Sequence, residues 1–150
     1  MKFPIDTPFK YGPQADMALA RPRVDIFTDG ACRGNPGPGA WAAVLLCGPK
    51  TKHIRGFVQH GTNNQMELTA AYFALSALKQ PCRVALHSDS EYLVKTMNGE
   101  YSRNANGDYW GYLEEMCAEH DVIWNWISRD YPLIHQAHNY AEELLRARGF

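Results

Sequence analysis

The sequence predicts an α/β domain built on a mixed five-stranded sheet that is flanked by helices. Three observations lead to this fold class. The chain has 150 residues, a length that suits one hydrophobic core. Three strand-like segments follow one another early in the chain, and later strand-like segments alternate with helical ones. An antiparallel meander followed by α/β crossovers produces a mixed sheet with the order β-β-β-α-β-α-α-β-α.

The first half of the chain predicts the antiparallel part of the sheet. Residues 24–29 (VDIFTD) are rich in branched and aromatic side chains and predict the first strand. The Gly- and Pro-rich stretch 34–39 predicts a hairpin connection. Residues 41–47 (WAAVLLC) are continuously apolar, which indicates a strand that is buried on both faces. Residues 53–59 predict a third strand, antiparallel to the second.

The second half predicts helices that alternate with two further strands. Thr62 followed by Gln65 is a capping-box pattern, which marks the start of a helix. Apolar residues then recur at a spacing of three to four up to Leu78, which predicts about four helical turns. Further strands are predicted at 83–89 and 122–127, short or terminal helices at 90–97, 110–117 and 141–147, and a polar loop at 98–108.

The amino-terminal residues and the composition restrict the class of protein. Residues 1–23 contain four prolines among polar residues and predict a loosely packed or disordered extension to a folded domain over 24–150. Fifteen Lys and Arg residues against 16 Asp and Glu give a net charge of −1, which excludes a protein that holds nucleic acid by bulk positive charge.

The apolar runs and the cysteines indicate where the protein works. No run approaches the roughly 18 apolar residues of a membrane helix, and the amino-terminus lacks the apolar core of a signal peptide. The cysteines are scattered and form no C-x-x-C pair, which argues against a zinc site and predicts reduced thiols in the cytoplasm. They are Cys32, Cys47, Cys82 and Cys117.

Two carboxylates follow predicted strands, and a third lies on the first long helix. Asp29 ends the first strand and Asp89 the fourth. If these strands are parallel neighbours, both acids lie at one edge of the sheet, where open α/β sheets bind ligands. Glu67 is placed to reach the same edge. Each acid alone suits a helix cap or a solvated surface, but three together repel one another unless a cation compensates them, and Mg²⁺ suits clustered carboxylates.

Three segments resemble bacterial-type ribonuclease HI. They are residues 28–39 (TDGACRGNPGPG), residues 62–68 (TNNQMEL) and residues 89–90 (DS), and the resemblance extends from about residue 24 to the end. It implies that 24–150 is a ribonuclease H-like catalytic domain that hydrolyses the RNA strand of RNA–DNA hybrids and leaves 3′-hydroxyl and 5′-phosphate ends. It also implies a pair of Mg²⁺ ions, replaceable by Mn²⁺, bound by Asp29, Glu67 and Asp89.

The resemblance is weaker towards the carboxyl-terminus. The family usually has an Asp at the start of the last helix, where this chain reads AEELL over 141–145. Glu142 in that position leaves the neighbouring apolar residues on the core face, so we predict Glu142 as the fourth metal-binding acid and keep Glu143 as the alternative. The family's histidine-bearing loop motif is missing. We predict that His135 takes that catalytic role from a loop, with His138 as the alternative.

The resemblance also implies residues that bind the hybrid without a large positive charge. Such hybrids are recognised through backbone shape and the 2′-hydroxyl. The implied residues are Cys32 and Gly34 through their backbone, Asn35, Asn63 and Asn64 through side-chain amides, and Thr62 and Asn106 at a pocket for a DNA-strand phosphate. The basic protrusion of many bacterial members looks truncated over 98–108, which predicts weaker salt dependence of binding.

Three functions therefore compete. The first is a metal-dependent endonuclease that cuts RNA in hybrids. The second is a hybrid-binding module that does not cleave, and the third is another polynucleotidyl transferase such as a junction resolvase. The expected partner is an RNA–DNA hybrid, with no membrane, and the chain is expected to act as a monomer.

Overall fold

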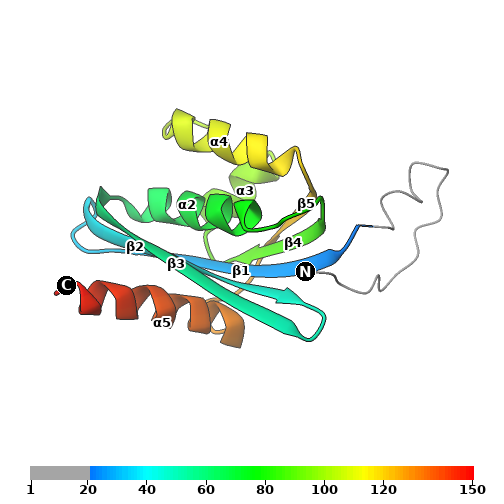
Figure 1. Cartoon of the computed structure of the whole chain (residues 1–150). Coiled ribbons are helices and arrows are strands. Elements are labelled where there is room, and N and C mark those ends of the chain that lie inside the picture. Colours follow the sequence, from blue (N-terminus) through cyan, green and yellow to red (C-terminus); the bar gives the residue numbers. More distant parts are fainter. Residues whose placement is uncertain (1–20) are drawn as a thin grey trace.

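The computed structural model describes residues 21–150, which form one five-stranded sheet with the strand order β3-β2-β1-β4-β5 (Figure 1). The predicted fold class is confirmed. Most of the predicted extension, residues 1–23, lies outside the described residues, and Arg23 is already the first residue of β1.

The strands occur where the sequence predicts them. β1, β2 and β3 form the antiparallel part, and β1, β4 and β5 run parallel. The first three exceed the predicted segments because their hairpin pairing continues to Cys32↔Gly39 and Gly37↔Gly61. Their bounds are Arg23–Cys32 for β1, Gly37–Cys47 for β2, Lys50–Gly61 for β3, Arg83–Ser88 for β4 and Asp121–Trp126 for β5.

The helices divide between the two faces of the sheet. Figure 1 shows α2, α3 and α4 together on one face and α5 alone on the other. The predicted capping box is present: Thr62 Oγ1 accepts a hydrogen bond from the Gln65 backbone N–H at 3.1 Å, and Gln65 Oε1 accepts one from the Thr62 N–H at 3.1 Å. The bounds are Asn63–Ser76 for α2, Glu91–Met97 for α3, Gly107–Cys117 for α4 and Pro132–Ala147 for α5.

The start of α5 corrects the prediction that His135 lies in a loop before the terminal helix. The helix begins at Pro132, nine residues earlier than predicted, because proline is well tolerated in the first helical turn. Ile134, Ala137 and Ala141 are fully buried at helical spacing against the sheet. Two of these three residues are alanine, so the apolar periodicity is weak in the sequence.

Two hydrophobic cores result. One lies between the sheet and α2 to α4, with Leu68, Leu93 and Trp110 among its buried residues. The other lies between the sheet and α5, with Phe27 and Ile134 among its members. In the part of the chain that the structure describes, no helix is long and apolar enough to cross a membrane. Helices therefore pack on both faces of the sheet, and polar groups lie in the loops at its edges.

Candidate active site

Three acidic residues converge where β1 and β4 run side by side. Thr28 of β1 pairs with Ser88 of β4 in parallel register, so Asp29 and Asp89, the next residue in each segment, reach the same edge of the sheet. One carboxylate oxygen from each of Asp29, Glu67 and Asp89 lies within 4.8 Å of the others. The structure thus brings together the three acids that the sequence analysis selected.

Glycine at position 30 allows α2 to carry Glu67 to this edge. A Cβ atom on Gly30 would lie 2.7 Å from Met66 Cβ and 2.8 Å from the backbone nitrogen of Glu67. Both separations are too short for non-bonded heavy atoms. The close approach of α2 to β1 therefore depends on the absence of a side chain beside Asp29.

Within the described residues, Glu67 is the one acid of the cluster that forms no ion pair with a basic side chain. Burial, followed by repulsion from Asp29 and Asp89, holds the pKa of Glu67 well above its usual range. Glu67 Oε1 is buried and has no hydrogen-bond partner among the described residues. Burial also raises the pKa of Asp29, whose exposed fraction is only 3%. Such a group of buried, under-satisfied oxygens fits a hard divalent cation.

A histidine of α5 borders the cluster, and it is the alternative rather than the predicted one. His138 Nδ1 donates a hydrogen bond to Asp29 Oδ2 at 2.8 Å, and this bond raises the pKa of His138. The placement of His135 in a loop is wrong, because α5 already includes it. His135 is exposed on α5, and its ring centroid lies 6.4 Å from that of His138.

The two candidates for the fourth acid face different neighbours. Glu142 Oε1 lies 4.0 Å from His138 Nε2, but Arg33 donates to both of its carboxylate oxygens, at 3.1 and 2.5 Å. This pairing lowers the pKa of Glu142. Glu143 is 63% exposed and lies 4.0 Å from Arg55 on β3. Glu142 therefore faces the site, although it is not one of the three clustered acids.

Arg129, which the sequence analysis did not select, completes the surroundings of Asp89. Its Nε donates to Asp89 Oδ2 at 3.1 Å, while its side chain is 76% exposed. Trp126 Nε1 also donates to the Asp89 carbonyl at 3.1 Å. The signal in the sequence is the position of Arg129 just after the fifth strand, because parallel neighbours end at the same edge of a sheet.

The residues implied for hybrid binding gather beside the start of α2. An open pocket of about 470 Å³ is lined by Asn35, Thr62, Asn63, Asn64, Ala105 and Asn106. Asn35 Oδ1 accepts a hydrogen bond from the Asn63 N–H at 2.8 Å, and Asn106 Nδ2 donates to the Tyr92 hydroxyl at 3.0 Å. Cys32 and Gly34 lie next to Asn35, at the β1–β2 connection. These groups are uncharged hydrogen-bonding groups held in place by their neighbours.

The segment over 98–108 offers little positive charge, as its sequence indicates. Its one arginine, Arg103, forms an ion pair with Glu114 of α4, and its guanidinium carbon lies 5.3 Å from the centroid of the Trp110 ring. Beside this segment, the pocket at the start of α2 therefore presents mainly amide and hydroxyl groups.

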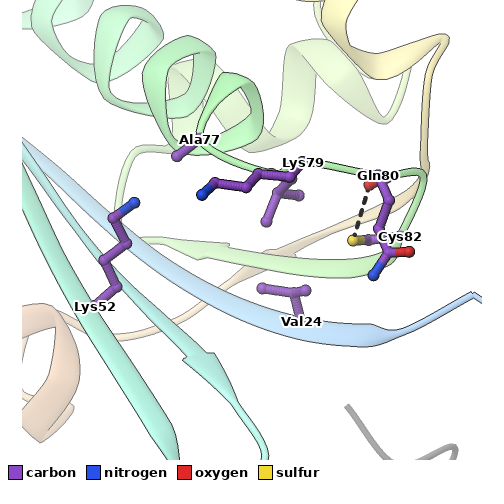
Figure 2. Close-up of a pocket in the computed structure, with 7 residues that line it drawn as sticks. Val24, Lys52, Ala77, Lys79, Gln80 and Cys82 are labelled. Carbon is purple, nitrogen blue, oxygen red and sulfur yellow. Dashed lines mark hydrogen bonds between the residues drawn. The ribbon is translucent and has the colours of Figure 1, made fainter. Parts of the chain in front are cut away.

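A second pocket lies at the other end of β1 and has a different chemistry. Figure 2 shows Lys52 and Lys79 at its mouth, with Val24 and Cys82 among its lining residues. Its volume is about 130 Å³. Cys82 Sγ donates to the Gln80 carbonyl at 3.1 Å, and burial raises the pKa of this thiol to about 11. With no lining carboxylate or imidazole, this pocket is a poor candidate for metal-dependent chemistry.

Comparisons with known proteins agree with the geometry. The profile of the RNase H family matches residues 21–130. Ribonuclease HI of Caulobacter vibrioides is 43% identical over 140 aligned residues, which cover 83% of this chain and 94% of that protein. Among solved structures, RNase H1 of Halobacterium salinarum superposes with a TM-score of 0.71 at 28% identity, covering 83% of this chain and 98% of that one. The N-terminal RNase H domain of a Mycobacterium tuberculosis protein reaches a TM-score of 0.76 at 22% identity, covering 83% and 94%.

Proposed function

Since this chain belongs to the RNase H family, we propose that it hydrolyses the RNA strand of RNA–DNA hybrids at Asp29, Glu67 and Asp89, with Mg²⁺, or Mn²⁺ in its place, as cofactor. The observation that carries the proposal is the buried Oε1 of Glu67, which has no partner within the described residues and lies among two further carboxylates. A protein that only binds hybrids gains nothing from such a cluster, since it repels phosphate.

The hybrid would lie across the β1–β2 connection and the start of α2. In this proposal the pocket around Thr62 and Asn106 holds a phosphate of the DNA strand. Backbone groups of Cys32 and Gly34 and the amide of Asn35 contact the RNA strand through its sugars. Cys32 follows Asp29 by three residues and Asn63 precedes Glu67 by four residues on α2, so a hybrid held by these groups would bring a phosphate of its RNA strand to the cation site.

Cleavage transfers the phosphoryl group to water. Bound divalent cations supply Lewis-acid activation of the attacking water and stabilise charge on the leaving oxygen. The bond from phosphorus to the 3′-oxygen breaks, leaving a 3′-hydroxyl and a 5′-phosphate. His138 orients the Asp29 carboxylate through its 2.8 Å hydrogen bond, and Arg129 holds Asp89 while exposing the rest of its guanidinium to a phosphate.

A second cation remains a prediction for this chain. It needs a further carboxylate, and Glu142 can supply one only if its ion pair with Arg33 opens. A calorimetric titration with Mg²⁺ or Mn²⁺ in the presence of hybrid counts the ions. We further propose that the protein acts in the cytoplasm, which its four free thiols support, and as a monomer, which sedimentation tests.

The proposal is tested by cleavage of labelled substrates in Mg²⁺ or Mn²⁺. We expect cutting of RNA in the hybrid and no cutting of double-stranded RNA or DNA. Asp29→Asn should reduce the rate by about a thousandfold or more, because it removes a charge that the cation site requires. Hybrid binding without cleavage in either metal would instead support the non-cleaving module, and cleavage of branched DNA would support a resolvase.

A further inference from the structure

The β1–β2 connection, residues 33–36, here called the substrate loop, is tightly built. The Arg33 N–H donates to the Pro38 carbonyl at 2.8 Å and closes the loop. A Cβ atom on Gly37 would lie 1.7 Å from the Arg33 carbonyl oxygen, so only glycine permits this path of the chain. On one side, the Asn35 side chain ties the loop to the start of α2 through its 2.8 Å hydrogen bond with the Asn63 N–H.

On the other side, Arg33 ties the same loop to α5. Its Nη1 and Nη2 donate to the two carboxylate oxygens of Glu142 at 3.1 and 2.5 Å, and its Nε donates to the Phe150 carbonyl at 3.3 Å. Figure 1 shows the carboxyl-terminal end of α5 beside this end of the β1–β2 hairpin. The loop is therefore connected to helices on both faces of the sheet.

The geometry and burial of the ion pair between Arg33 and Glu142 restrict its movement. Two parallel N–H···O bonds restrict the guanidinium and the carboxylate in both distance and orientation. The Glu142 side chain is only 17% exposed, so water competes little for its oxygens.

We propose that Arg33 and Glu142 form a clamp that positions the substrate loop for the RNA strand. This inference rests on the proposed function, and it gives Glu142 a role in the closed ion pair that is separate from its predicted role as a metal-binding acid. Because Arg33 holds the loop and contacts Glu142 and Phe150 and none of the three clustered acids, loss of its side chain should weaken hybrid binding and leave the chemical step largely intact.

A double-mutant cycle tests the clamp. We expect Arg33→Gln and Glu142→Gln each to raise KM for the hybrid by about tenfold, with the kcat of Arg33→Gln within about twofold of wild type, and the KM of the double variant to be no higher than that of either single variant. Glu143→Gln, the neighbouring exposed carboxylate on α5, is the matched control and should change neither constant. Amide hydrogen exchange of residues 33–36 should accelerate in the two single variants and not in the control.

Each other outcome overturns the clamp. A large fall in kcat for Glu142→Gln, with KM and amide exchange unchanged in both single variants, identifies Glu142 as a metal-binding acid that does not position the loop. A rise in KM for Arg33→Gln alone identifies a direct contact between Arg33 and the RNA. Unchanged constants and unchanged exchange in both variants exclude a positioning role. Failure of the wild-type protein to cleave any hybrid contradicts the proposed function instead, and the exchange measurement then still decides whether the ion pair fixes the loop.

Discussion

Glu67 and Glu142 are two glutamates on either side of one site, and their surroundings are opposite. Glu67 is buried among other carboxylates, and its pKa is raised well above the usual range, first by burial and then by the charges of Asp29 and Asp89. Glu142 has both oxygens bound by Arg33, and this hydrogen-bonded pairing lowers its pKa. Both residues are glutamates that the sequence predicts as metal-binding acids, yet only Glu142 is paired with a basic side chain among the described residues.

The difference separates a site that needs a cation from one that does not. A buried carboxylate without a counter-charge costs stability, and a bound divalent ion removes that cost. An ion pair with an arginine already supplies the counter-charge. We therefore expect the cation at the end of the site formed by Asp29, Glu67 and Asp89, and positioning of the loop at the end formed by Arg33 and Glu142.

The largest expected effect that tests this comparison is the loss of catalysis when Glu67 is substituted. Glu67→Gln keeps the shape of the side chain and removes its charge, so we expect kcat in Mg²⁺ to fall by about a thousandfold while the fold is retained. Steady-state cleavage of a labelled hybrid measures the rate, and circular dichroism checks the fold. Turnover within a few-fold of wild type would show that Glu67 is not part of the catalytic site.

A smaller effect is expected at His138, which orients Asp29 from α5. His138→Ala removes the hydrogen bond to Asp29 Oδ2, and we expect kcat to fall by about tenfold to a hundredfold, as for residues that orient a metal ligand. His135→Ala, on the same helix, is the control and should leave kcat within about twofold. A larger loss of kcat for His135→Ala than for His138→Ala would instead support His135, the histidine that the sequence predicts in the catalytic role.

Much of the fold follows from local sequence patterns, and those elements can be predicted from the sequence. The β-branched and aromatic run that begins at Val24, the capping box at Thr62 and the apolar run from Trp41 each determine an element without reference to the rest of the chain. The ends of strands are less local. β1 continues past Asp29 to Cys32 because its partner β2 continues, and a single strand carries no sign of its partner's length.

The candidate site likewise has features that local sequence patterns predict and features that they do not. Asp29 and Asp89 are predictable as neighbours because each follows a strand and the two strands are parallel. The pairing of Arg33 with Glu142 joins residues 109 positions apart, and no local pattern indicates it. The placement of His135 in a loop fails for a related reason, since it depends on where α5 begins, and alanines mark the buried face of that helix only faintly.

We expect the acidic cluster to be a cation site in which Glu67 is the carboxylate without a basic partner among the described residues. The pKa of Glu67 is higher in the folded than in the unfolded protein, so its contribution to stability is present below its unfolded pKa of about 4.3 and is lost as pH rises through the raised folded pKa. Without metal at pH 7, Glu67→Gln should therefore be more stable than wild type, and below about pH 4 this difference should vanish.

Thermal unfolding of wild type and Glu67→Gln, with and without Mg²⁺, tests this claim most directly. Without metal at pH 7 we expect Glu67→Gln to melt at least about 2–4 °C higher, which corresponds to about 1 kcal/mol in a domain of this size. Saturating Mg²⁺ should raise the Tm of wild type and close that gap, with little effect on the variant. A variant that melts lower than metal-free wild type, together with a wild-type Tm that Mg²⁺ does not change, would contradict the account.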